Sequence, residues 1–302
     1  MSGPADLFPG FAERRVSTDA GSIFARVGGA GPPLVLLHGF PQTHAEWHAI
    51  AADLAEHFTV VAPDLRGYGA SSVPASVRGE GYAKRAMGGD VLQLMRSLGH
   101  ESFTLVGHDR GARVGYRLAL DHPDRVTQLA LLDIMPTVAM WDGMNAARAM
   151  QVYHWTFLAQ PEPLPEMLLA AAPDDFIDLK LAQWSGDGAL GAFDKRALDA
   201  YRAFFAEPER RHACCEDYRA GATIDVAHDR ADLEAGRTIA CPTLVLWGDA
   251  GIPAASSSPL DTWRATFAPA ATGLPIAAGH FLPEENPRAT LDALMPFLSE
   301  TA

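Results

Sequence analysis

Short apolar runs alternate with longer helical patterns along most of this chain, and this alternation restricts the fold more than any other feature. Strand-like runs cover residues 22–28, 33–39, 58–65, 103–109, 126–134, 243–249 and 273–280. Several are rich in Val, Leu and Ile without polar alternation, which is typical of strands buried on both faces of a sheet. Helical patterns fall between them, including 82–98, 111–121 and 284–299. The alternation predicts an α/β fold with a doubly wound, mostly parallel sheet.

The alternation stops after Ile134. Residues 136–225 are helical in pattern and rich in aromatic side chains, and strand signals resume only at Thr243. We therefore expect a helical cap, 136–225, inserted into one core that comprises 1–135 and 226–302. Such a cap would cover the carboxyl edge of the sheet, where open α/β sheets bind their ligands.

Composition narrows the possible partners. The formal net charge of −13 argues against nucleic acid and anionic membranes, and an anionic substrate would need a locally positive pocket. The three cysteines form no Cys-x-x-Cys pair and indicate a reducing compartment rather than a disulfide framework. The N-terminus lacks a signal-peptide pattern, and no apolar run has membrane-spanning length. These features predict a soluble cytoplasmic protein.

Cofactor motifs are missing from the sequence. His44 and His48 are spaced i and i+4, but the metalloprotease order His-Glu-x-x-His is absent and no third ligand is evident. The sequence also lacks a glycine-rich nucleotide loop. We expect neither a metal nor a cofactor.

The segment "LVGHDRGARVG", residues 105–115, has the layout of the nucleophile elbow Gly-x-Ser-x-Gly, with Asp109 in place of the serine. A sharp strand-to-helix turn would project residue 109 from the sheet, and Gly107 and Gly111 provide the small neighbours that this turn needs. An ordinary turn with Asp109 as a helix N-cap is the structural alternative. The strand before the turn, the helix after it and both glycines favour a catalytic carboxylate.

The partners of this carboxylate are expected at the same edge of the sheet. The backbone N–H groups of Phe40, which follows "HG", and of Arg110 could form an oxyanion hole. His38 is expected to be structural. His280 follows the last strand and precedes a helix, which is where α/β-hydrolases place their catalytic base.

Two aspartates at strand ends could orient that histidine, Asp133 and Asp249. Many α/β-hydrolases place the acid in a Trp-Gly-x-x-Asp pattern, and counting from Trp247 leads to Gly251, which has no carboxylate. Asp249 can simply make a turn. Asp133 lies among apolar residues, where a buried carboxylate needs a partner, so we expect Asp133 to be the acid.

Arg110 and Arg113 lie three positions apart at the start of one helix and therefore share a face. They could neutralise Asp109, or they could clamp a substrate carboxylate, which matches their planar guanidinium groups. Charge counting favours the clamp, because Asp109 and a carboxylate substrate would otherwise bring two negative charges together in a pocket of low dielectric.

The cap offers hydrogen-bond donors. His154 and Trp155 have N–H groups, and Tyr218 has an O–H group. Packing is the commoner role of such side chains, so residue type alone does not assign them to a site.

An aspartate nucleophile restricts the chemistry. It attacks carbonyl groups poorly, but it can displace a leaving group at saturated carbon to form an alkyl ester, which water activated by His280 would hydrolyse. Hydrolytic dehalogenation and epoxide ring opening both fit this scheme. A departing halide needs donors around it, whereas an epoxide oxygen stays attached and needs an acid, usually a cap tyrosine.

The chain resembles the fluoroacetate dehalogenases of the α/β-hydrolase superfamily. The resemblance runs nearly end to end, through "FARVGGAGPPLVLLHGFPQTH", "GHDRGARVGYRLALDHP", "YHWTFLAQPEPLPE", "CEDYRAGA" and "GHFLPEE". It implies an α/β-hydrolase fold and hydrolysis of fluoroacetate, and of small 2-haloacids such as chloroacetate, to glycolate and halide. It further implies a reaction without metal or cofactor, often in a homodimer.

The resemblance also implies roles for individual residues. Asp109 would attack the halogen-bearing carbon, and Arg110 and Arg113 would bind the substrate carboxylate. His280 and Asp133 would be the base and the acid. Three donors would surround the halide and a tryptophan would shape the pocket, namely His154, Trp155, Tyr218 and Trp184. Two alternatives stay open: an epoxide hydrolase with the same nucleophile, and a binding protein without activity on a hydrolase scaffold.

Overall fold

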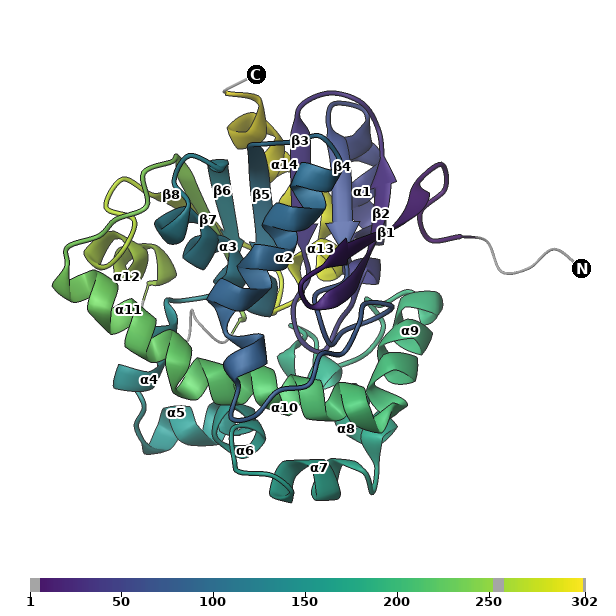
Figure 1. Cartoon of the computed structure of the whole chain (residues 1–302), viewed down its shortest axis with the longest axis vertical. Helices are drawn as coiled ribbons and strands as arrows, with labels where there is room; N and C mark the ends of the chain where they lie inside the picture. Colours follow the sequence, from purple (N-terminus) through teal and green to yellow (C-terminus); the bar gives the residue numbers. More distant parts are fainter. Residues whose placement is uncertain (1–5, 252–257, 301–302) are drawn as a thin grey trace, which may run out of the picture.

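The computed structural model describes residues 6–251 and 258–300 and contains an eight-stranded sheet with helices on both faces (Figure 1). The strand order is β1-β2-β4-β3-β5-β6-β7-β8. Strands β3 to β8 are parallel to their neighbours, whereas β1 pairs with β2, and β2 with β4, in antiparallel fashion. The predicted α/β fold with a mostly parallel sheet is therefore confirmed. The strands are Ala12–Thr18 (β1), Gly21–Gly28 (β2), Pro33–Leu37 (β3), Thr59–Pro63 (β4), Phe103–His108 (β5), Val126–Leu132 (β6), Thr243–Gly248 (β7) and Thr272–Ile276 (β8).

Strand β1 has no counterpart among the predicted runs. Its sequence is AERRVST, and none of its residues is fully buried. It pairs with β2 along its whole length, from Ala12 opposite Val27 to Thr18 opposite Gly21. A strand at the edge of a sheet keeps one side in solvent, so it needs no continuous apolar run, and hydrophobic patterning misses it.

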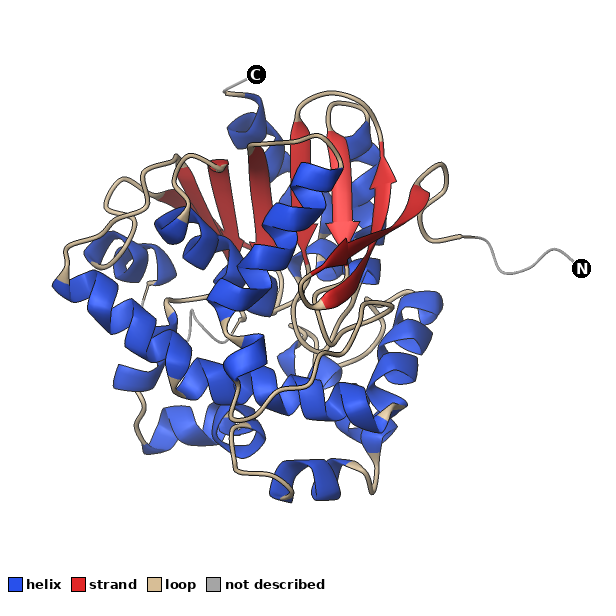
Figure 2. Ribbon diagram, viewed as in Figure 1, coloured by secondary structure: helices blue, strands red, loops and turns tan. Residues whose placement is uncertain are grey.

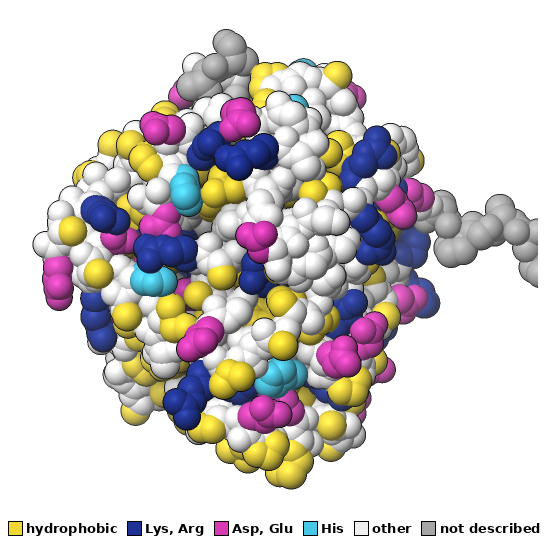
Figure 3. Space-filling view, in the orientation of Figure 1, with side chains coloured by type: hydrophobic (Ala, Val, Ile, Leu, Met, Phe, Trp, Pro, Cys, Tyr) yellow, Lys and Arg dark blue, Asp and Glu magenta, His cyan; other side chains and the backbone are white. Residues whose placement is uncertain are grey.

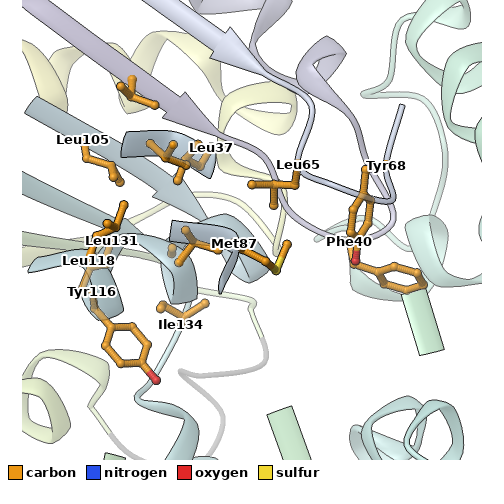
Figure 4. Packing of buried hydrophobic residues seen from close by; sticks show 14 of the residues in the cluster. Leu37, Phe40, Leu65, Tyr68, Met87, Leu105, Tyr116, Leu118, Leu131 and Ile134 are labelled. Carbon is orange, nitrogen blue, oxygen red and sulfur yellow. The ribbon is translucent and has the colours of Figure 1, made fainter. Parts of the chain in front are cut away.

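Apolar residues on the two faces of the sheet form two separate core clusters. Along β3, Val35 and Leu37 belong to one cluster, while Leu34 and Leu36 belong to the other, as the pleat of a strand requires. Helices α2 (Lys84–Ser97), α3 (Asp109–Asp121) and α12 (Pro259–Ala265) supply the first cluster. Helices α1 (His48–Ala55), α13 (Leu282–Glu285) and α14 (Pro287–Ser299) supply the second. Figure 4 shows part of the first cluster, with Leu37, Leu105 and Leu131 from adjacent strands beside Met87 and Leu118.

Between β6 and β7 the chain forms a group of helices that lies beyond the carboxyl ends of the strands (Figure 2). We call residues 137–234 the cap. The predicted boundary at residue 225 lies at the second residue of α11, next to the break at Thr223 that separates α10 from α11. Helix α11 itself ends before Gly236, which has a φ of 64°. The cap helices are Thr137–Asp142 (α4), Ala146–Gln151 (α5), Tyr153–Leu158 (α6), Leu164–Leu169 (α7), Pro173–Trp184 (α8), Lys195–Ala206 (α9), Pro208–Ala222 (α10) and Ile224–Glu234 (α11).

The surface seen in Figure 3 mixes acidic and basic side chains, and apolar side chains gather at the end of the molecule where α7 lies. Leu164, Met167 and Leu168 of that helix are exposed. Among the described residues, no helix is both long enough and apolar enough to cross a membrane.

Candidate active site

The turn between β5 and α3 holds Asp109 in an unusual backbone conformation. Its φ is 40°, in the left-handed region that residues other than glycine rarely adopt. A Cβ atom at Gly107 would lie 2.6 Å from the Cα of Ala112, and one at Gly111 would lie 2.2 Å from the carbonyl oxygen of Leu37. Both positions therefore require glycine. A strained strand-to-helix turn with this close packing is the geometry of a nucleophile elbow.

The loop after β3 brings a backbone donor to the Asp109 carboxylate. The N–H of Phe40 donates to Oδ2 of Asp109 at 3.1 Å. A Cβ atom at Gly39 would lie 2.6 Å from the Cβ of Asp109, so glycine permits this close approach. Arg110 is the second residue of α3, and its backbone N–H belongs to the first turn, where helices leave their N–H groups without an internal acceptor.

His280 and Asp133 form a hydrogen-bonded pair. Nδ1 of His280 lies 2.5 Å from Oδ2 of Asp133, and the backbone N–H of Gly248 donates to Oδ1 of Asp133 at 2.9 Å. Both side chains are buried. Gly251, where the usual acid would lie, has a further role: a Cβ atom there would be 2.7 Å from Oδ1 of Asp133. Glycine at this position leaves room for a carboxylate that comes from β6 instead.

Two residues that the sequence analysis weighed lie outside this group. The ring of His38 is engaged by the backbone on both sides, because Nε2 accepts from the N–H of Leu65 at 3.0 Å and Nδ1 then donates to the oxygen of Gly39 at 2.9 Å. Asp249 is exposed, and its backbone N–H donates to the oxygen of Ile276.

A small cavity joins these groups to the cap. Its volume is about 30 Å³. A buried water needs roughly 10–15 Å³ by the same measure, so the cavity has room for two or three water molecules or a solute of similar size. Phe40 and Arg110 are predicted site residues that do not line it. The lining residues are Asp109, Arg113, Asp133, Ile134, Met135, Met140, Val152, His154, Trp155, Trp184, Tyr218 and His280.

The cap side of the cavity presents neutral donors. Burial, with a further contribution from Lys180, lowers the pKa of His154 well below its ordinary value, so its imidazole is uncharged at neutral pH. Burial raises the pKa of Tyr218 well above its ordinary value, so its hydroxyl keeps its proton. The ring of Tyr218 lies 5.7 Å from that of His154 and 6.2 Å from that of Trp155. Trp184 completes this wall, with its ring 4.4 Å from His154.

Arg113 is a buried cation with uncharged partners. Its Nη1 donates to the oxygen of Met135 at 3.1 Å and to Oγ1 of Thr137 at 2.9 Å, and its guanidinium lies 4.6 Å from the ring centre of Trp155. Among the described residues it forms no ion pair, and its Nε has no hydrogen-bond partner. Burial lowers the pKa of Arg113 despite the opposing charge of Asp109. This guanidinium is therefore suited to bind an incoming anion.

Arg110, in contrast, already has a carboxylate partner. Its Nε donates to Oδ2 of Asp217 at 3.1 Å, and its Nη2 contacts Oδ1 of the same side chain. Burial opposes the charge of Arg110, but Asp217 outweighs burial and raises its pKa well above the ordinary value. Lys84 also contacts Asp217. The charge count made from the sequence was incomplete, because it left out a buried carboxylate and a buried ammonium group.

The Asp109 carboxylate is poised in its ionised form. Burial alone would raise its pKa, but the charges of His280, Arg113 and Arg110 outweigh burial and lower that pKa below the ordinary value. Asp109 is thus negatively charged at neutral pH, which is the form that a nucleophile requires.

A second charged pair lies behind Asp109 and was missed by sequence reasoning. Nδ1 of His108 lies 3.0 Å from Oε1 of Glu46, and Oε2 of Glu46 accepts from the N–H of Gly39 at 3.0 Å. Burial would lower the pKa of His108, but Glu46 and neighbouring carboxylates raise it to about 9. This raised pKa favours an imidazolium at His108, directly before Asp109. Glu46 is far from it in sequence, and no local pattern could have paired them.

Comparisons with known proteins agree with this geometry. Residues 32–287 match the model of the alpha/beta hydrolase fold family. A fluoroacetate dehalogenase of Burkholderia sp. is 44% identical over 97% of this chain and 96% of its own length. The chain belongs to the fluoroacetate dehalogenase family of α/β hydrolases.

Epoxide hydrolases are also among the relatives of this dehalogenating hydrolase. A soluble epoxide hydrolase of a Corynebacterium strain is 29% identical over 90% of this chain and 91% of its own length. A solved mutant of a Pseudomonas aeruginosa protein, named as a proposed epoxide hydrolase, contains bound MFA. It is 46% identical, covers 98% of both chains and superposes with a TM-score of 0.91.

Proposed function

We propose that the enzyme hydrolyses fluoroacetate, and other small 2-haloacids such as chloroacetate, to glycolate and halide. The proposal rests mainly on one observation, the small cavity that an ionised Asp109 shares with Arg113 and the neutral cap donors. This combination matches a substrate with a carboxylate at one end and a carbon–halogen bond at the other.

In the first step, an oxygen of Asp109 attacks the halogen-bearing carbon, and the carbon–halogen electron pair leaves as halide. The product is a carboxymethyl ester of Asp109. Arg113, with Arg110 beside it, would hold the substrate carboxylate. The leaving halide would accept hydrogen bonds from His154, Trp155 and Tyr218. Fluoride is a poor leaving group and is strongly hydrated in water, so preorganised donors in a closed site reduce the cost of its departure.

In the second step, His280 removes a proton from water, which attacks the carboxyl carbon of the Asp109 ester. The N–H groups of Phe40 and Arg110 would stabilise the oxyanion. Its collapse breaks the bond to the glycolate oxygen, which takes the proton held by His280, and regenerates Asp109 with one oxygen from water. The imidazolium formed on His280 would be stabilised by Asp133, which already accepts from Nδ1.

The cavity weighs against an epoxide hydrolase. At about 30 Å³ it has little room for a substrate the size of styrene oxide. Among the described residues that line it, Tyr218 is the single tyrosine available as an acid for the epoxide oxygen. The cationic Arg113 would face an apolar substituent, which would leave a buried charge without a partner.

Halide release from purified enzyme tests the proposal. A fluoride electrode should record turnover of fluoroacetate, and chloride release should follow from chloroacetate. The Asp109→Asn variant should show neither. Hydrolysis in water enriched in ¹⁸O should place the label in Asp109 after one turnover. Turnover of styrene oxide, with no halide release from any haloacetate, would refute the proposal in favour of an epoxide hydrolase.

We also propose that the enzyme is a homodimer that uses the apolar surface of α7 and α8. Leu168 and Leu179 line one shallow groove and are 53% and 56% exposed. Contiguous exposed apolar residues are costly in a monomer and commonly mark an interface. Light scattering should give twice the chain mass, and Leu168→Glu should shift the equilibrium toward monomer. A monomeric wild-type protein at micromolar concentration would contradict this assignment.

A further inference from the structure

A buried group of charged residues lies at the junction of the cap and the core, beside the proposed carboxylate site. Asp217 comes from α10 of the cap, whereas Arg110, Lys84 and Tyr68 come from the core. All four side chains are almost completely buried. An ionised carboxylate at such a position needs a full set of partners.

Asp217 has that set. Its carboxylate accepts from the hydroxyl of Tyr68 at 2.9 Å and from Nε of Arg110 at 3.1 Å, and it contacts Nη2 of Arg110 and Nζ of Lys84. Its backbone oxygen accepts a further bond from Nη2 of Arg110 at 2.6 Å. The neighbouring helical turn is shaped for the same guanidinium, because a Cβ atom at Gly221 would lie 3.2 Å from Nη2 and 3.4 Å from Nη1 of Arg110.

These contacts occupy one edge of the Arg110 guanidinium. Nε and Nη2 both bond to Asp217, whereas Nη1 is buried and has no partner among the described residues. The guanidinium is planar and its donors point in fixed directions, so holding one edge fixes where Nη1 points. The guanidinium also lies 4.4 Å from the ring centre of Tyr218, which faces the cavity.

We propose that Asp217 is a positioning residue for substrate binding: it holds Arg110 by the Nε–Nη2 edge and leaves Nη1 to meet the substrate carboxylate. This inference rests on the proposed function. If Asp217 has this role, it affects substrate specificity, because the cap completes the carboxylate site only when α10 is docked against α3.

Because Lys84 contacts Asp217, an experiment can separate the positioning of Arg110 by Asp217 from the effect of the Asp217 charge on anion binding. A lone carboxylate near the site would repel an anionic substrate, so its removal would tighten anion binding. The ammonium group of Lys84 offsets that repulsion at short range. If orientation dominates, neutralising Asp217 weakens carboxylate binding. If charge dominates, the same substitution strengthens it. The two readings predict changes of opposite sign.

The test compares two ions that react with nothing in the site. Acetate reports on the arginines, and bromide reports on the cap donors. Calorimetric titration of wild-type enzyme and Asp217→Asn should show acetate binding weakened by about tenfold or more, with bromide affinity within about twofold. The KM for chloroacetate should rise in parallel with the acetate dissociation constant. Asp90→Asn is the matched control, since Asp90 is a buried partner of Arg66 at 2.5 Å and does not line the cavity.

A milder variant keeps the inference testable if Asp217→Asn does not fold. Tyr68→Phe removes one hydrogen bond to Asp217 and no charge, and it should weaken acetate binding by about two- to fivefold. Unchanged or tighter acetate binding in these variants would overturn the inference, and so would an equal loss of acetate and bromide. A wild-type enzyme that binds acetate but releases no halide would refute the proposed function instead, and would leave the Asp217 comparison valid.

Discussion

Replacing Arg113 by methionine should nearly abolish activity while leaving the fold stable. Arg113 is buried with uncharged partners, and its lowered pKa shows that burial penalises its charge. Arg117 lies one turn further along α3, is equally buried, and forms an ion pair with Asp232. The two arginines therefore form a matched pair, one without a carboxylate partner and one with such a partner.

The expected losses of activity and of stability depend on which charged group each substitution leaves without an ion-pair partner. Arg113→Met would leave the substrate carboxylate buried with one cation fewer, a loss of about 3–5 kcal/mol, or roughly 10²–10⁴-fold in kcat/KM. Its free energy of unfolding should change by less than about 1 kcal/mol, because no carboxylate loses an ion pair. Arg117→Met removes the buried cation that pairs with Asp232, Asp121 and Asp229. Asp232 would keep an ion pair with the exposed Arg237, but the loss of the buried cation should still lower the free energy of unfolding by about 3–5 kcal/mol.

The assays are chloride release from chloroacetate and urea-induced unfolding followed by circular dichroism. The pH profile adds a third measurement. Arg113 is among the charges that lower the pKa of Asp109, so the acid limb of kcat/KM should move to higher pH in Arg113→Met. A kcat/KM of Arg113→Met within about threefold of wild type would exclude Arg113 as the anion site, and a loss of stability as large as that of Arg117→Met would exclude its lack of an ion-pair partner.

Three further outcomes are expected. His280→Ala should release about one halide per enzyme and keep the ester, visible as a mass increase of the intact protein; continuous turnover would contradict the assigned base. Gly251→Ala places a Cβ atom 2.7 Å from Oδ1 of Asp133, so stopped-flow halide assays should show a normal first release of halide and slower hydrolysis of the ester. Gly191→Ala is the control and should resemble wild type, because a Cβ atom there would have nothing within 4 Å. Burial raises the pKa of Asp229 from 3.8 to about 6, so its contribution to stability is lost as pH rises through that range. Asp229→Asn should remove up to about 3 kcal/mol of this decline in unfolding titrations, and an unchanged slope would exclude Asp229 as its source.

Much of the fold could be read from local patterns. The buried strands β3 to β7 appear as apolar runs because both of their faces are covered, and α2 and α3 appear through their helical periodicity. Edge strand β1 gave no such signal because its exposed residues need not be apolar. The break in the strand rhythm predicts an inserted cap, and its predicted end at residue 225 lies close to the break at Thr223 between α10 and α11.

The residues of the candidate site likewise fall into two groups, those that local patterns predict and those that only the fold brings together. Asp109, His280 and Asp133 could be proposed from their positions at strand ends, because parallel strands bring those ends to one edge of the sheet. The buried carboxylates that pair with Arg110 and His108 could not be proposed. Asp217 reaches Arg110 from 107 positions away, and Glu46 reaches His108 only through the packing of the loop after β3.

Short-range patterning and strand order encode the sheet, the turn at Asp109 and the residues gathered at the sheet edge, so these features could be predicted from sequence. Which charges are already paired depends on the tertiary structure. Electrostatic interactions in a buried site depend on contact distances between residues far apart in the chain, and burial multiplies their strength. Arg110 and Arg113 look equivalent in sequence, but among the described residues the fold pairs Arg110 with Asp217 and gives Arg113 no carboxylate partner.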